Sequence, residues 1–166
     1  MSSREISEML NMALQIETEG RRFYLECMER TAHAGGKEMF KYLAQEETIH
    51  YETVEKIYRR EFEKEYLSFK KTEAGLGASG IFKMKVPGGA ADANGGALDA
   101  LNIAIKAEDN SALLYRRLAG ASKNPRLQKV FARLAEEEKK HFYILEKEVE
   151  SLTKTGAYTD FRIVTT

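Results

Sequence analysis

Apolar side chains recur every three or four residues along four long stretches of this chain, which is the period of an amphipathic α-helix. The stretches run from residue 3 to about 30, from about 37 to the mid-60s, from about 97 to 122 and from 125 to about 153. Ser2 and Glu5 form the sequence of a capping box before the first stretch, and Asn124-Pro125 suits the start of the fourth. We therefore predict an all-α protein built from four helices.

Residues 68–97 interrupt this pattern, because seven of the chain's twelve glycines and Pro87 fall among them. Neither flanking helix pair could bury its apolar stripes alone, so we interpret the interruption as a long crossover inside one domain. The prediction is an antiparallel four-helix bundle made of two duplicated helical hairpins. Its parts are the helix pairs at 3–67 and 98–153, the crossover at 68–97 and a C-terminal tail at 154–166, all within a single domain at 1–166.

Composition narrows the class of protein. Charged residues make up 31% and apolar residues 43% of the chain, with only two prolines, and this balance suits long helices. The formal net charge is zero and we expect no face with an excess of Lys or Arg, so we also expect no binding to nucleic acid. The chain starts without an apolar signal core and has no apolar run of transmembrane length, so we expect a cytoplasmic protein without a membrane partner. The single Cys27 excludes an internal disulfide and any Cys-x-x-Cys site.

The two helical hairpins repeat each other at an offset of 91 residues without a gap. What repeats is mainly a set of acids, imidazoles and tyrosines. The matched positions are Glu17 with Glu108, Tyr24 with Tyr115, and Glu47-x-x-His50 with Glu138-x-x-His141. Each of these acids and histidines falls inside the apolar stripe of its helix, so each side chain should point toward the bundle axis.

Four buried carboxylates at one level need a positive counterpart, because burying even one unpaired carboxylate costs several kcal/mol. No Lys or Arg shares these stripe positions at that level. Two divalent cations would balance the four charges and leave the imidazoles as nitrogen ligands. One Glu from each of two helices plus Glu-x-x-His from the other two is the dinuclear carboxylate pattern of four-helix bundles. The predicted metal ligands are Glu17, Glu47, His50, Glu108, Glu138 and His141.

Spacing alone would also admit Glu46 and Glu137, which are repeated and lie four residues before the histidines. Both fall at the edge of the apolar stripe, whereas Glu47 and Glu138 fall near its middle, and we choose the latter pair. Gly20 lies one turn after the first acid. It allows either a close helix approach or open space beside the metals.

Tyr24 and Tyr115 each follow a predicted ligand by seven residues, two turns along the same helix face. Helical side chains lean toward the N-terminus, so each hydroxyl should point back to the metal layer. We predict that each donates a hydrogen bond to a ligating carboxylate of another helix and holds its orientation. The alternative is a core tyrosine whose hydroxyl is satisfied elsewhere.

Four segments together resemble the rubrerythrin group of the ferritin-like superfamily: ALQIETEGRRFY, YLAQEETIHYE, AIKAEDNSALLY and RLAEEEKKHFYIL. The resemblance implies a left-handed ferritin-like bundle with a non-haem di-iron centre held by the six residues above. It also implies that Glu47 and Glu138 bridge the metals and that the protein is a homodimer. Iron is the expected metal, and manganese, which accepts similar ligands, is the alternative.

Two departures from the family pattern bear on function. With only Cys27, the chain has no four-cysteine rubredoxin module, so electrons must come from a separate donor, rubredoxin-like or another reductant. Ser111 stands where the family carries a further glutamate, which can exchange with a histidine when the oxidation state changes.

Three functions follow, in order of preference. The first is a di-iron oxidoreductase that reduces hydrogen peroxide, or dioxygen, to water. The second is ferritin-like oxidation of Fe²⁺ for storage or delivery, where storage would require a closed shell of many subunits. The third is a metal-free structural bundle that retains unused ligands, which buried acids would destabilise unless they were protonated.

Overall fold

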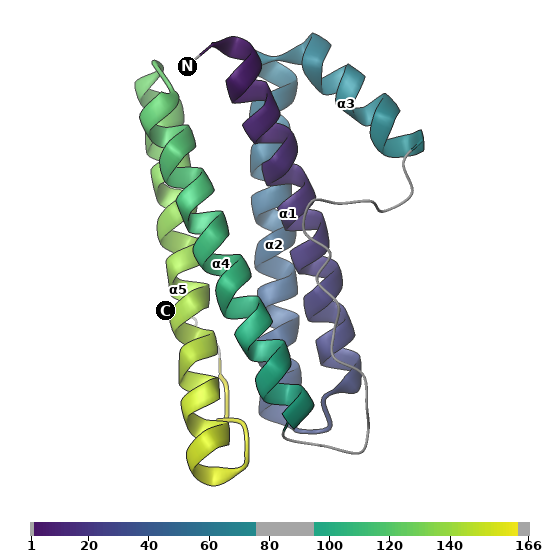
Figure 1. The fold of residues 1–166 in the computed structure, drawn as a ribbon, viewed down its shortest axis with the longest axis vertical. Coiled ribbons are helices and arrows are strands. Elements are labelled where there is room, and N and C mark those ends of the chain that lie inside the picture. The colour runs from purple at the N-terminus through teal and green to yellow at the C-terminus, as the bar shows by residue number, and fades with distance from the viewer. Residues whose placement is uncertain (1, 76–94, 163–166) are drawn as a thin grey trace.

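The computed structural model describes residues 2–75 and 95–162, and each regular element within those ranges is an α-helix (Figure 1). The helices are α1 (Ser3–Arg30), α2 (Ala34–Glu61), α3 (Glu63–Gly75), α4 (Gly95–Ala121) and α5 (Pro125–Thr155). The four long helices run side by side, and α3 turns away from the end of α2. The predicted all-α four-helix bundle is therefore confirmed. None of the helices in the described ranges is long and apolar enough to cross a membrane.

The helix ends follow the local signals in the sequence. The Ser2 backbone N–H donates to Glu5 Oε2 at 2.7 Å, and the Glu5 N–H donates to Ser2 Oγ at 3.3 Å, which completes the predicted capping box. At the start of α5, Asn124 Oδ1 accepts from the Arg126 N–H at 3.0 Å. Gly156 ends α5 in the left-handed region with φ 72°, a conformation that glycine adopts without strain.

The bundle core consists of two apolar clusters, one on each side of a polar layer. One cluster joins the first halves of α1 and α5 to the second halves of α2 and α4, and it includes Leu10, Leu14, Tyr58, Leu118 and Phe131. The other joins the opposite halves and includes Phe23, Phe40, Leu43, Leu101 and Leu145. α1 packs against α2 and α4, and α4 packs against α5. Every long helix thus crosses from one cluster to the other at the level where its predicted ligands lie.

The second helix ends earlier than its periodicity predicts. α2 stops at Glu61, Phe62 leaves helical geometry with φ −143° and ψ 51°, and α3 begins at Glu63. The break turns Tyr66 back over the end of the core, where its ring centroid lies 5.6 Å from that of Tyr58. Residues 68–75 and 95–97, predicted to belong to the crossover, are helical as parts of α3 and α4. The remaining crossover at 76–94 lies outside the described residues.

The C-terminal tail folds back along α5 and packs on the start of α2. The Thr159 backbone N–H donates to the buried Glu148 carboxylate at 2.9 Å, and the Thr159 hydroxyl donates to its other oxygen. A Cβ on Gly35 would lie 2.1 Å from the Thr159 carbonyl oxygen, so only glycine allows this approach. Gly35 lies in the first turn of α2. This helix begins three residues before the predicted start at Lys37.

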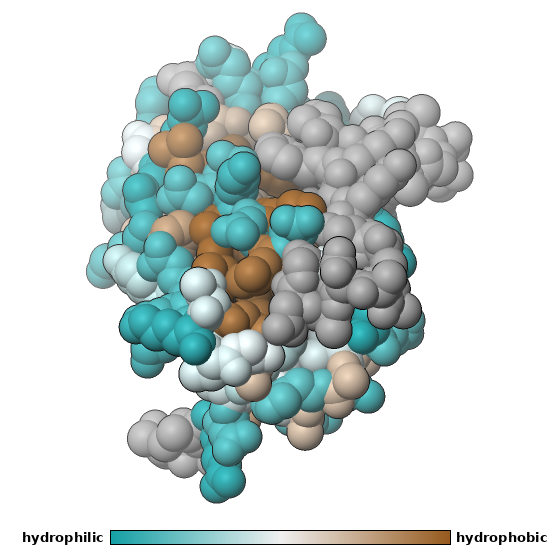
Figure 2. All heavy atoms as spheres, turned by 60° about the horizontal axis from the view of Figure 1, so that its bottom comes forward, coloured by the Kyte–Doolittle hydropathy of each residue, from teal (hydrophilic) through white to brown (hydrophobic). Residues whose placement is uncertain are grey.

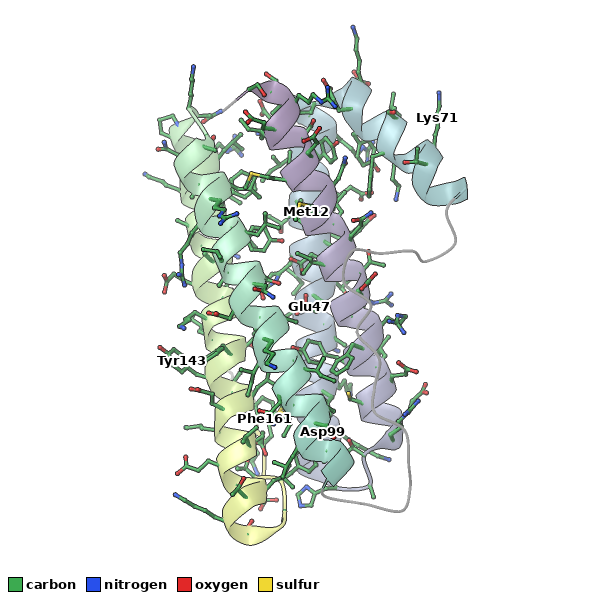
Figure 3. All side chains as sticks on the ribbon, in the orientation of Figure 1. Met12, Glu47, Lys71, Asp99, Tyr143 and Phe161 are labelled. Atoms are coloured by element: carbon green, nitrogen blue, oxygen red, sulfur yellow. The ribbon has the colours of Figure 1, made fainter. Side chains whose placement is uncertain are left out.

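Seen toward this end of the bundle, hydrophilic side chains cover much of the surface and apolar side chains gather in one area near its centre (Figure 2). The side-chain view shows the same division along the length of the bundle. Glu47 points between the helices, whereas Lys71 and Tyr143 point outward (Figure 3). An inward glutamate in an otherwise apolar interior marks the layer that separates the two clusters.

Candidate metal centre

Each long helix contributes at least one buried carboxylate to the polar layer, and α2 and α5 also contribute a histidine. All six residues predicted as ligands are at most 3% exposed: Glu17, Glu47, His50, Glu108, Glu138 and His141. The structure therefore brings together all the residues that the repeat singled out. It does so because the helical periodicity of each apolar stripe carries the polar residue inward with its neighbours.

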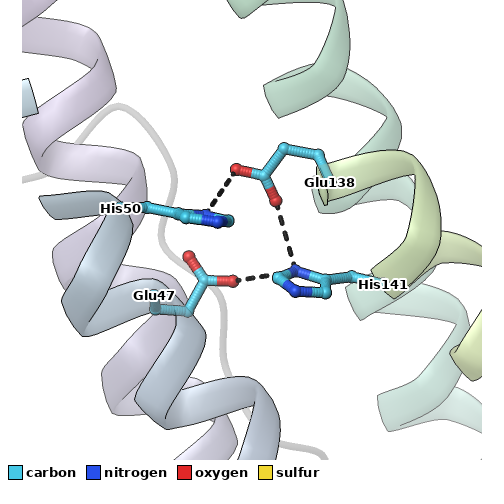
Figure 4. Close-up of side chains that lie close together, drawn as sticks. All are labelled: Glu47, His50, Glu138 and His141. Carbon is cyan, nitrogen blue, oxygen red and sulfur yellow. Dashed lines mark ion pairs between the residues drawn. The ribbon is translucent and has the colours of Figure 1, made fainter. Parts of the chain in front are cut away.

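The centre of the layer holds the two Glu-x-x-His pairs from α2 and α5 (Figure 4). One potential ligand atom from each of Glu47, His50, Glu138 and His141 lies within 4.8 Å of the others. Glu138 lies between the two imidazoles, with Oε1 3.2 Å from His50 Nδ1 and Oε2 3.4 Å from His141 Nδ1. Glu47 Oε1 lies 3.8 Å from His141 Nδ1.

The two remaining acids flank this group symmetrically. Glu17 Oε2 of α1 lies 3.6 Å from His50 Nδ1, and Glu108 Oε2 of α4 lies 3.6 Å from His141 Nδ1. The offset of 91 residues relates these two contacts, so the site has an approximate twofold symmetry. Each half of the site consists of an outer carboxylate beside an imidazole, and the two central carboxylates lie between the halves.

Two tyrosines hold the outer carboxylates across the interface of α1 and α4. The Tyr24 hydroxyl donates to Glu108 Oε1, and the Tyr115 hydroxyl donates to Glu17 Oε1. These are contacts to a carboxylate of another helix, so the alternative of a hydroxyl satisfied elsewhere is excluded. Burial, followed by the charge of Glu108, raises the pKa of Tyr24 well above its usual value, so this hydroxyl remains a donor.

Gly20 provides room for the carboxylate of Glu47. A Cβ at this position would lie 3.2 Å from both Cδ and Oε2 of Glu47, closer than an ordinary van der Waals contact. The space beside Gly20 is therefore not open but filled by this side chain, which the glycine allows to approach α1 closely.

Without a cation, the layer balances its charge with protons. Burial, together with the charges of Glu17 and Glu108, raises the pKa of Glu47 well above its usual range and that of Glu138 to about 8. Burial alone would lower the pKa of His141, but the carboxylates of Glu108 and Glu138 raise it to about 10. Protons held by the acids and imidazoles therefore provide the positive charge that a bound cation would otherwise supply.

The inward-facing atoms have the properties expected of metal ligands. Those without a hydrogen-bond partner are Glu17 Oε2, both oxygens of Glu138, and the Nδ1 atoms of His50 and His141. Buried polar atoms are rarely left without a hydrogen bond, because each such atom costs free energy. Mixed carboxylate and imidazole donors suit divalent transition metals. The six residues fit a metal centre.

Glu137, which the sequence analysis set aside as a ligand, has a contact with the site that was not predicted. Its Oε2 lies 3.4 Å from His50 Nε2, the ring nitrogen that faces away from the layer, and its Oε1 accepts from Arg133 Nε at 2.9 Å. The close approach of His50, with help from Arg133, lowers the pKa of Glu137 to about 2. The sequence did contain a signal for this role, because Glu137 is repeated as Glu46. Metal-bound imidazoles usually donate their other N–H to a carboxylate, and a repeated acid close to the histidine could be that carboxylate.

Two further positions define the surroundings of the site. The buried Ser111 donates its hydroxyl to the Ala107 carbonyl at 3.0 Å, so its side chain is engaged within its own helix.

On the α2 side, the ring of Tyr42 packs edge-on against His141 with 6.3 Å between centroids, and the ring centroid of Phe161 in the tail lies 5.7 Å from that of Tyr42. The tail thereby covers one flank of the layer.

Comparisons with known proteins agree with this fold. A family model described as Rubrerythrin matches residues 8–77 and 99–163. Among solved structures, a hypothetical protein from Pyrococcus furiosus aligns with a TM-score of 0.74 and 25% sequence identity, covering 92% of this chain and 93% of its own. A search of curated protein sequences finds no match.

Proposed function

The chain belongs to the rubrerythrin family, and we propose that its buried cluster is a di-iron centre that reduces hydrogen peroxide, or dioxygen, with electrons from an external donor. One observation carries the proposal: six acids and histidines, almost fully buried, converge from four helices, and four of them (Glu17, His50, Glu138 and His141) have inward atoms without a hydrogen-bond partner. The proposed ligands are Glu17, Glu47, His50, Glu108, Glu138 and His141. Manganese remains the alternative metal.

Two bound iron ions would supply two electrons at one place, which matches the requirement of peroxide. Each H₂O₂ takes up two electrons and two protons and gives two waters. The protein's own contribution is orientation and exclusion of water. Tyr24 and Tyr115 fix the outer carboxylates, Glu47 and Glu138 would hold the metals from the middle of the layer, and the apolar clusters close the layer on both sides.

Rapid mixing of anaerobic, iron-loaded and reduced protein with hydrogen peroxide or with oxygen tests the proposal. We expect peroxide to produce diferric absorbance much faster than it oxidises free Fe²⁺ under the same conditions. A faster reaction with oxygen than with peroxide would identify an oxidase. Oxidation no faster than that of free Fe²⁺ with either oxidant would rule out the proposed enzyme.

Ferritin-like iron oxidation is the second candidate, and Ser111 favours it. The further carboxylate that could exchange with a histidine is absent at this position, so the redox-linked exchange is not available there. Storage would require a closed shell of many subunits. We propose a homodimer instead, with twice the chain mass of 18.8 kDa. Light scattering of the metal-loaded protein separates the two, since a large assembly would support storage.

A further inference from the structure

Positive charge is concentrated in one segment of the bundle, although the chain as a whole is neutral. Residues 110–135, which span the end of α4, the turn and the start of α5, contain six Lys or Arg residues and no Asp or Glu. All six side chains are exposed: Arg116, Arg117, Lys123, Arg126, Lys129 and Arg133. The neutral net charge therefore conceals a basic surface that the sequence analysis did not recognise.

Three of these residues form one stripe on α5. Arg126, Lys129 and Arg133 follow one another at spacings of three and four residues, which places them on a single helix face. We call them the α5 basic stripe. Within the described ranges, Arg126 and Lys129 have no ion-pair partner. Arg126 also lies in the first turn of α5, where a positive charge opposes the helix dipole. Local helix stability therefore does not explain this residue.

The α5 basic stripe continues directly into the metal site. Arg133 is 72% exposed at its side chain and donates to Glu137 at 2.9 Å, while Glu137 contacts His50 Nε2 at 3.4 Å. His50 Nδ1 then faces the layer of acids. Two side chains, Arg133 and Glu137, thus connect the protein surface with an imidazole of the proposed centre. In the other half of the repeat, Tyr42 stands at the position equivalent to Arg133. A connection through an arginine is therefore found on one side of the site.

We propose that the α5 basic stripe is the docking surface for an acidic one-electron carrier protein, and that electrons enter the site on the Glu137–His50 side. This inference rests on the proposed function, which needs an external donor. Two reduced carriers each lose one electron, and one H₂O₂ gains both electrons and two protons to give two waters. Opposite charge on the two proteins would steer and orient their encounter. We favour a protein over a nucleic acid because the stripe ends at a redox site, which nucleic acid binding would not require.

A redox-inactive probe tests docking independently of the chemistry. Zinc-substituted rubredoxin, a small acidic protein, is titrated into the metal-loaded protein by calorimetry. The variant Arg126→Glu/Lys129→Glu is compared with Arg21→Glu/Lys37→Glu, which changes the same charge at exposed sites on α1 and α2. We expect binding to weaken about tenfold or more in the α5 variant and less than about threefold in the control. Equal weakening in both variants, or no binding by the wild type, would overturn the proposal.

Folding and alternative partners are checked in the same series. The α5 variant should melt no lower than the wild type, because an acidic residue near a helix N-terminus is favoured by the helix dipole. Single-stranded RNA serves as the competing probe, and tighter RNA binding through the same stripe would replace the protein partner with a nucleic acid.

Turnover then separates docking from the proposed function. We expect the ratio of peroxide turnover with reduced rubredoxin to turnover with dithionite to fall in the α5 variant and to stay constant in the control. An unchanged ratio would contradict electron entry at this surface. Failure of peroxide reduction with both reductants would refute the proposed function, while the calorimetry would still decide whether the stripe binds an acidic protein.

Discussion

Two tyrosine hydroxyls show how single side chains shape the site. Tyr24 and Tyr115 were predictable from the sequence, because each follows a repeated acid by two helical turns and leans back toward it. Glu137 was considered as a ligand and set aside, and its contact with His50 was not predicted, since a wheel for α5 alone places it at the stripe's edge. Its contact with His50 depends on how α5 faces α2, which is a property of the assembled bundle.

The substitution Tyr115→Phe should weaken metal binding without disrupting the fold. It removes the hydrogen bond to Glu17 and frees that carboxylate to rotate, so we expect metal affinity to fall by about tenfold or more. Tyr58→Phe is the matched control, because it removes the hydroxyl that donates to Asn11 at 2.7 Å, away from the polar layer. Competition with a metal chelator measures both. Equal losses of affinity would show that Tyr115 acts only through general stability.

The helices were predictable as regions, but their breaks were not. Apolar positions continue through Tyr58, Phe62, Tyr66 and Phe69 at helical spacing, so nothing in the pattern marks the end of α2 at Glu61. The docking of the C-terminal tail was equally hidden. It depends on a backbone approach at Gly35 that only the folded arrangement of α2 and the tail creates.

Gly35→Ala should release the tail from the bundle. The new methyl group would lie 2.1 Å from the Thr159 carbonyl oxygen, a backbone atom that can move only with the tail. We expect a loss of about 1–3 kcal/mol in the free energy of unfolding, as in other overpacked sites. The Thr159 amide donates to Glu148 in the wild type, and its hydrogen exchange should become faster in the variant.

Gly120→Ala is the control for helix propensity, because its new methyl group meets nothing within 4 Å. It should leave the tail in place and stabilise α4 by up to about 1 kcal/mol. Unchanged Thr159 exchange in Gly35→Ala would mean that the tail does not depend on this contact.

The fold as a unit is two related hairpins arranged around one charged layer. This architecture could be predicted because the repeat places the same residues in each half, and a layer of buried acids requires a counter-charge. The basic surface of residues 110–135 could not be recognised from the total charge. It results from the uneven distribution of charges along α4 and α5 rather than from their sum.

The metal-free protein should lose stability as the pH rises. The pKa of Glu138 is raised from 4.5 to about 8 and that of His141 from 6.5 to about 10, so the folded state binds these protons more tightly. Their stabilisation is complete below the unfolded pKa values and is lost as the pH passes through the folded ones. We therefore expect the thermal midpoint of metal-free protein to decrease as the pH rises from about 4.5 to about 10. A midpoint that rises over this range would contradict the proton-sharing layer, and metal-loaded protein should lack the decline.

The metal content of the purified protein tests the proposed centre most directly. Elemental analysis, before and after anaerobic reconstitution with Fe²⁺, should give about two metal ions per chain, as the dinuclear pattern requires. The variant Glu47→Gln/Glu138→Gln removes both central carboxylate charges and should bind far less metal while remaining helical by circular dichroism. A wild-type protein that binds little or no metal after reconstitution would contradict the proposed centre and, with it, the enzyme.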